Sequence, residues 1–106
     1  MTATETPVLN TLADLTALSM ERCALAPREL MLARIAALIA VDAPPVSYMA
    51  NAGAAADSGI TGDDIQALMI GISPVVGTPK VVAAAGNILR ALGFAIIAAE
   101  AADAAQ

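Results

Sequence analysis

Apolar residues recur along this chain at helical spacing, and a proline or a small polar residue stands before most apolar stretches. After Thr6-Pro7, leucines follow at every third residue, and proline suits the first position of a helix because its missing N–H has no partner there. This pattern predicts a first helix from Pro7 to about Met20. Long runs with strand alternation do not occur, so the pattern favours an all-α chain.

The second predicted helix runs from Pro27 to about Val41 and is apolar on nearly all sides. A helix of this kind is typically central in its domain. Arg34 is the charge in its middle, and a buried charge needs a partner. We expect a structural ion pair, for which the candidates are Asp14, Glu21, Asp42 or a carboxylate of another subunit. The alternative is that Arg34 binds an acidic ligand.

The third predicted helix is opened by Pro44-Pro45, with Asp42 as its expected cap, and it runs to about Asp57. Ser58-Gly59 is a typical C-terminal stop, because glycine readily adopts the left-handed conformation that ends a helix.

Two further start signals predict the last two helices. In "TGDD", residues 61–64, Thr61 and Asp64 have the spacing of a capping box, which predicts a fourth helix from about Gly62 to Ile72. In "GTPK", residues 77–80, a threonine and a proline predict the start of a long last helix. Five helices with short connections fit a single compact domain over residues 1–106.

The composition is strongly apolar, which raises the question of what covers the apolar surface of so small a chain. Hydrophobic residues make up 58% of 106 residues, and the mean hydropathy is +0.74. A membrane span needs roughly 18 to 20 consecutive apolar residues, and polar or charged side chains interrupt every run here. We therefore expect no membrane association, and a homo-oligomer in which symmetric contacts cover the excess apolar surface.

Charge and rare residues exclude several classes of function. The net charge is −5 with five scattered basic residues, whereas nucleic-acid binding needs clustered ones. The chain has no histidine and one cysteine, so the commonest metal ligand, the commonest general base and an internal disulfide are all absent. We expect no metal and no cofactor. The N-terminal segment does not resemble a secretory signal, and a cytoplasmic location is expected.

Two segments carry a resemblance to a known family: "RELMLARIAALIA" (residues 28–40) and "SGITGDDIQALMIGISPVVGTPKVVAA" (residues 58–84). They resemble the carboxymuconolactone decarboxylase family, which includes the alkylhydroperoxidase D-like proteins. Shared features are a glycine, a short cap, an acidic pair and a Gly-x-Pro turn before the last helix. The resemblance covers about residues 12–95. It implies an alkylhydroperoxidase D-like helical fold and a homotrimer or homohexamer.

The same resemblance locates the family's chemistry. Its alkylhydroperoxidase-like branch has a C-x-x-C pair and a histidine on the third helix and a glutamate on the second, and these positions here hold Pro44, Ser47, Asn51 and Leu32. Thiol peroxidase action needs a thiolate and usually a resolving thiol, so we do not expect it. The decarboxylase branch keeps the histidine, and Asn51 cannot take up a proton at neutral pH, so the family's decarboxylation is not expected either.

Ser47, Tyr48 and Asn51 are the candidate site residues. One hypothesis is a polar pocket that binds a small ligand, with Arg34 as a further ligand-binding group. The other is that Ser47 and Asn51 bond to neighbouring backbone groups while Tyr48 packs at an interface with its hydroxyl solvated. Cys23 lies between the first two helices and is expected to be a small buried residue rather than a reactive thiol.

Two functions follow from these patterns. The first is a non-redox, oligomeric binding or structural protein that keeps the family scaffold without its chemistry. The second is a cofactor-free enzyme, a decarboxylase, isomerase or lactone-acting enzyme, that uses Ser47, Tyr48 and Asn51 on a small organic acid.

Overall fold

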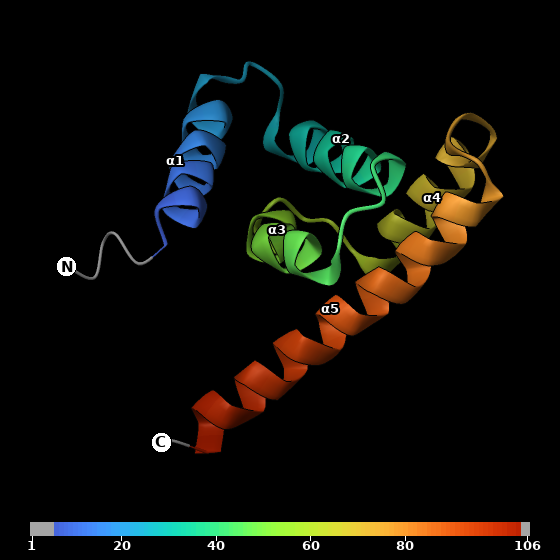
Figure 1. The fold of residues 1–106 in the computed structure, drawn as a ribbon. Helices are drawn as coiled ribbons and strands as arrows, with labels where there is room; N and C mark the ends of the chain where they lie inside the picture. Colours follow the sequence, from blue (N-terminus) through green and yellow to red (C-terminus); the bar gives the residue numbers. More distant parts are fainter. Residues whose placement is uncertain (1–5, 105–106) are drawn as a thin grey trace.

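The computed structural model describes residues 6–104, and side chains are described for residues 6–92. This part of the chain forms five α-helices and no strand (Figure 1). They are α1 (Pro7–Arg22), α2 (Pro27–Ala40), α3 (Pro45–Asp57), α4 (Gly62–Val76) and α5 (Thr78–Ala104). The prediction of an all-α chain of about five helices is confirmed.

Helix α2 is the centre of the packing, as its apolar sequence predicts. It packs against α3, α4 and α5. Met31, Ile35 and Ile39 recur every fourth residue on one face and are buried, and Ile39 has no exposed surface. Burial of three large side chains on one face holds the other helices around α2 by the hydrophobic effect.

The turn after α2 differs from the prediction. Asp42 was expected to cap α3, but it ends α2 instead, with a φ of 56° in the left-handed region. The Asp42 N–H donates to the Ile39 carbonyl (3.2 Å) and the Ala43 N–H donates to the Leu38 carbonyl (3.0 Å). These two bonds are a Schellman motif, in which a left-handed residue satisfies the last helix carbonyls. Helix α3 begins after Pro44, which makes no side-chain cap bond.

Helix α5 fixes this turn from the opposite side. The Lys80 ammonium donates to the Ala40 carbonyl (2.9 Å), and the Asn87 amide donates to the Ala43 carbonyl (3.2 Å). Both carbonyls belong to the end of α2 and the connection to α3. The long helix therefore holds α2 and α3 in a fixed relation beside it.

The predicted stop of α3 and the predicted start of α4 are confirmed. Gly59 has a φ of 80°, and the Ile60 N–H donates to the Ala55 carbonyl (3.0 Å). Thr61 and Asp64 form the capping box: the Asp64 N–H donates to the Thr61 hydroxyl (3.2 Å) and the Thr61 N–H donates to the Asp64 carboxylate (2.8 Å). Backbone groups at both ends of the connection between α3 and α4 therefore have hydrogen-bond partners.

Arg28, at the start of α2, adds a long-range clamp that the sequence patterns did not indicate. Its guanidinium makes two bonds to the Asp64 carboxylate (2.8 and 3.1 Å) and one to the Gly59 carbonyl (2.9 Å). Among the residues with described side chains, Arg28 and Asp64 form the one ion pair. The pair joins the N-terminal ends of α2 and α4 across the end of α3.

Helix α4 is longer than predicted, because it continues through Pro74 to Val76. Proline removes a backbone donor, which leaves the carbonyl four residues earlier without its helical partner. Here that carbonyl belongs to Ile70, and it accepts a bond from the Ser73 hydroxyl (2.9 Å). The helix ends at Gly77, whose φ is 97°.

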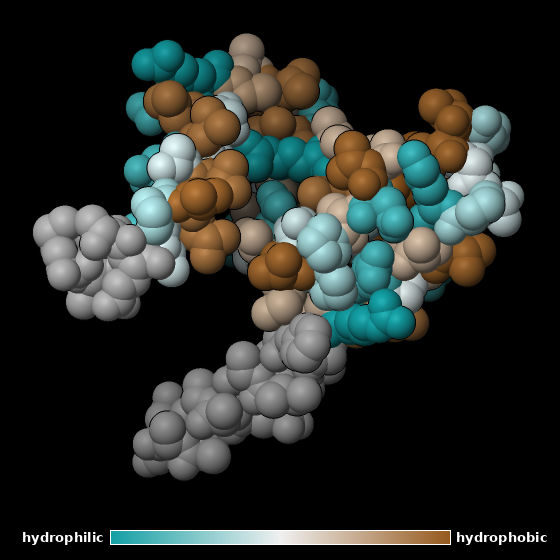
Figure 2. All heavy atoms as spheres, viewed as in Figure 1, coloured by the Kyte–Doolittle hydropathy of each residue, from teal (hydrophilic) through white to brown (hydrophobic). Residues whose placement is uncertain are grey.

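Helix α1 packs least against the others. None of its residues is buried, and Leu9, Leu12 and Leu15 each expose half of their surface or more. Figure 2 shows hydrophobic side chains gathered along α1, on the side that faces the rest of the molecule. Contact with α2 includes two bonds from Arg34, to the Thr16 carbonyl and to the Ser19 hydroxyl. The apolar stripe of α1 therefore has little cover within one chain.

The whole chain is open for its size. Its accessible surface is 7143 Å², whereas a compact monomer of 10.6 kDa has about 5,500 Å². Its radius of gyration is 15.0 Å, against about 13 Å for a compact domain of this length. Figure 1 shows the C-terminal half of α5 extending beyond the other helices. Within the described chain, no helix has both the length and the apolar character that crossing a membrane requires.

Candidate ligand pocket

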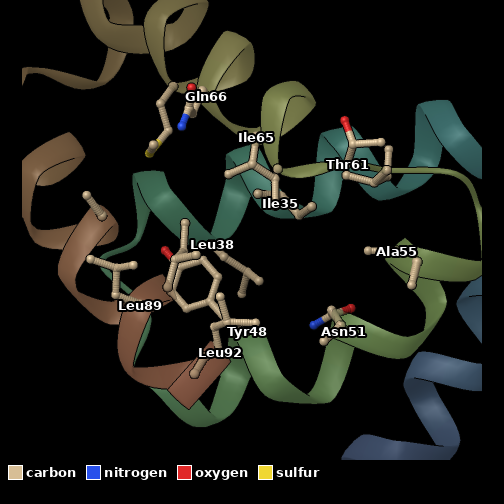
Figure 3. Close-up of a pocket in the computed structure, with 18 residues that line it drawn as sticks. Ile35, Leu38, Tyr48, Asn51, Ala55, Thr61, Ile65, Gln66, Leu89 and Leu92 are labelled. Carbon is tan, nitrogen blue, oxygen red and sulfur yellow. The ribbon is translucent and has the colours of Figure 1, made fainter. Parts of the chain in front are cut away.

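A pocket of about 600 Å³ lies among α2, α3, α4 and α5 (Figure 3). This volume is within the usual range of small-molecule sites, roughly 300 to 1,000 Å³. Apolar side chains provide most of the wall: Ile35, Leu38, Ile60, Ile65, Met69, Ile88, Leu89 and Leu92, with alanines of α3 and α5. Most of these residues are among the apolar residues that recur at helical spacing along the chain and were expected to face the core. Their periodicity did not show that space would remain between them.

Helix α3 contributes the polar part of the wall. Tyr48, Asn51 and Ala55 recur at spacings of three and four, so they share the face of α3 that lines the pocket. Figure 3 shows Tyr48 on the side where Leu89 and Leu92 of α5 lie, and Asn51 nearer to Ala55. Ser47, the third candidate, does not line the pocket. The structure therefore brings two of the three α3 candidates together.

Tyr48 is a packed wall residue whose hydroxyl is not solvated. The residue is 7% exposed, and its hydroxyl is buried with no hydrogen-bond partner among the described residues. The hypothesis of a wet hydroxyl at an interface is wrong for the single chain. Burial, and secondarily the charge of Asp42, raises the pKa of Tyr48 above its ordinary value. The phenol is therefore neutral at pH 7, so Tyr48 is a hydrogen-bond donor and not a base.

Asn51 has one half of its amide engaged. Its Nδ2 donates to the Ser47 carbonyl one turn earlier (2.9 Å), as the structural hypothesis expected of it. A carbonyl accepts only from the N–H side, so this bond fixes which end of the amide is nitrogen. Within the described chain, Oδ1 accepts from no protein group, and Asn51 is half-buried in the pocket wall. The side chain therefore offers the pocket Oδ1 as an acceptor and the second N–H of Nδ2 as a donor.

Arg34 lies outside the pocket, and it forms no ion pair with Asp14, Glu21 or Asp42. Pairing with a carboxylate of another subunit stays a prediction. Arg34 is half-buried on α2 and bonds to Thr16 and Ser19 of α1, with no carboxylate partner among the residues whose side chains are described. The reason is geometric: Asp14, Glu21 and Asp42 lie on parts of the chain that its side chain does not meet. Arg34 holds α1 instead.

The other positions singled out in the sequence also lie away from the pocket. Leu32, Pro44, Ser47 and Asn51 were singled out by the resemblance, and of these four Asn51 alone lines the pocket. Cys23 follows directly after α1 and is half-buried, not buried as predicted. Within the described residues, no cluster of three or more carboxylate, thiol or imidazole groups is placed to hold a metal ion.

Sequence reasoning missed Gln66 and Thr61 of the pocket wall. Thr61 was assigned to the capping box, which does engage its hydroxyl, and Gln66 is an exposed residue of α4. No protein-family model, curated protein or solved structure matches this chain. The chemistry of the pocket is therefore argued from its own residues.

Proposed function

We propose that this protein is a non-redox binding protein whose pocket among α2, α3, α4 and α5 holds a small apolar molecule. One observation carries the proposal: the pocket has the volume of a ligand site, and the described residues of its wall include no thiol, imidazole, carboxylate or cation. Apolar walls with a few polar groups are typical of small-molecule sites. The resemblance to the carboxymuconolactone decarboxylase family is compatible with this use of a helical scaffold.

The alternative of a cofactor-free enzyme on a small organic acid has less support. Tyr48 is the titratable residue of the pocket wall, and its raised pKa keeps it protonated at pH 7. General-base catalysis needs a group whose pKa lies near the working pH. An organic acid would also lose its hydration in the pocket without meeting a cation, because Arg34 lies elsewhere.

Self-assembly is the second part of the proposal. The exposed leucines of α1, a surface well above that of a compact monomer and the extended α5 support a homo-oligomer, which we propose is a homotrimer or homohexamer. The single cysteine supports a reducing, cytoplasmic location.

Uptake of N-phenyl-1-naphthylamine, a neutral probe that fluoresces in apolar surroundings, tests the binding function. We expect saturable uptake by the wild type and at least a tenfold loss in Ala85→Leu, which adds three carbons to the pocket wall on α5. Filling apolar space also stabilises a fold, by about 1 kcal/mol per buried methylene, so this variant is expected to unfold at a higher urea concentration.

Ala33→Leu is the matched control, because it makes the same change at an exposed position of α2 outside the pocket. It is expected to bind the probe as the wild type does. Equal uptake by both variants would mean that the probe binds elsewhere, and absence of saturable uptake by the wild type would contradict the proposed function.

A further inference from the structure

Asn51 gives the pocket a polar group of fixed orientation. The bond from its Nδ2 to the Ser47 carbonyl (2.9 Å) holds the amide in place, and leaves Oδ1 without a protein donor among the described residues. An occupant that displaces water from this acceptor leaves it unpaired unless the occupant supplies a donor. In Figure 3 the Asn51 side chain lies on the α3 side of the pocket, between Tyr48 and Ala55.

The other polar groups of the wall are less able to compete for an occupant. The Thr61 hydroxyl is engaged with Asp64 in the capping box. The Tyr48 hydroxyl is buried and has no contact with solvent, so its ring is the part that faces an occupant. Gln66 is exposed and lies nearer the solvent than Asn51. Among the described wall residues, Asn51 is thus the partly buried side chain whose polar atoms are available to an occupant.

The absence of charge from the wall limits the occupant further. An ion that enters an apolar pocket loses hydration, and among residues 6–92 no charged side chain lines this one to compensate. A carboxylate is an acceptor only: it could accept from the second N–H of Nδ2 of Asn51, but it cannot bond to Oδ1.

We infer that the pocket selects an uncharged molecule with an apolar body and one hydroxyl group, whose O–H donates to Oδ1 of Asn51. The inference rests on the proposed function and assigns its ligand class. A ketone of equal length can accept from the second N–H of Nδ2 but has no donor for Oδ1, whereas a hydroxyl can do both, and an alkyl acid is ionised at pH 7. One neutral hydrogen bond is worth about a fivefold difference in affinity.

Three compounds with chains of the same length test the assignment: 1-octanol, 2-octanone and octanoate, each used at pH 7 to displace N-phenyl-1-naphthylamine from the full-length protein. For the wild type, we expect 1-octanol to bind about fivefold more tightly than 2-octanone, and octanoate to bind more weakly than either. In Asn51→Leu, 1-octanol and 2-octanone are expected to bind equally. Asn51→Ala, whose alanine is a strong helix former, is the second variant and should also lose the difference.

Asn87→Leu is the matched control. Asn87 also donates through its Nδ2 to a backbone carbonyl, that of Ala43, but it does not line the pocket. It is expected to be less stable and to keep the fivefold preference for the alcohol.

Equal affinities for alcohol and ketone in the wild type, a preference that survives both Asn51 variants, or tightest binding of octanoate would each overturn the inference while leaving the proposed function intact. Failure of the probe itself to bind the wild type would overturn both.

Discussion

Polar side chains of the described residues form hydrogen bonds mostly with backbone groups rather than with one another. Asn51 holds the Ser47 carbonyl, Asn87 holds the Ala43 carbonyl, and Arg34 reaches the Thr16 carbonyl. Sequence spacing predicted that Ser47 and Asn51 share a face of α3 with Tyr48 beside it, whereas Tyr48 and Asn51 line the pocket and Ser47 does not. The spacing did not predict that Ser47 and Arg34 face elsewhere, because the direction of a helix face depends on how neighbouring helices pack against it.

Asp42 is the residue whose predicted and observed roles differ most. An aspartate between two helices fits a cap of the second as well as a stop of the first, and the φ of 56° shows that it is the stop. Glycine adopts this conformation without the strain that a Cβ causes. Asp42→Gly is therefore expected to raise the free energy of unfolding by about 0.5 to 1 kcal/mol in urea titrations.

Asp57→Gly provides the comparison, because it makes the same change in the last helical residue of α3. There glycine only weakens the helix, by about 0.3 kcal/mol. If both variants lost stability, the left-handed geometry of Asp42 would not be a source of strain.

At the scale of the elements, helix starts were predicted well because their causes are local. Proline at the first helical position and the capping box of Thr61 depend on residues within one turn. Helix ends were predicted less well: α4 passes Pro74 because Ser73 satisfies the carbonyl that proline leaves open. The clamp from Arg28 was not predicted because its partners lie 31 and 36 residues away.

The Arg28 clamp makes the junction of α2 and α4 sensitive to acid. Bonds from Arg28 and Thr61 hold the pKa of Asp64 well below its ordinary value. Because the pKa is lower in the folded state, the pair stabilises the fold above about pH 4, where an unfolded aspartate ionises, and this contribution is lost as the pH falls further. The wild type is expected to lose stability below pH 4 more steeply than Asp64→Asn.

Urea unfolding at pH 7, 4 and 3 measures this difference. Asp63→Asn, which changes the neighbouring carboxylate and leaves the bonds of Asp64 intact, should keep the wild-type dependence on acid. Parallel curves for the wild type and Asp64→Asn would show that the clamp does not contribute to acid sensitivity.

The whole molecule is expected to assemble, which its mass in solution measures. The exposed leucines of α1 favour assembly, so light scattering is expected to give three or six times 10.6 kDa. Leu12→Glu places a charge in the apolar stripe, where Leu12 is 51% exposed, and should shift the protein toward the monomer.

Ala17→Glu, on the opposite side of α1, is expected to leave the mass unchanged. A wild-type mass of 10.6 kDa at micromolar concentration would contradict the assembly proposed here. The proposed binding of the probe would then be tested separately, because residues 35–92 of a single chain already enclose the pocket.

The position of Tyr48 also gives the molecule an optical property. The chain contains one tyrosine and no tryptophan, and that tyrosine forms part of the pocket wall. Near-ultraviolet circular dichroism arises from aromatic rings held in asymmetric surroundings, and it disappears when side-chain packing is lost. In this protein the tyrosine band comes from a single ring, and it therefore reports directly on how α3 packs around the pocket.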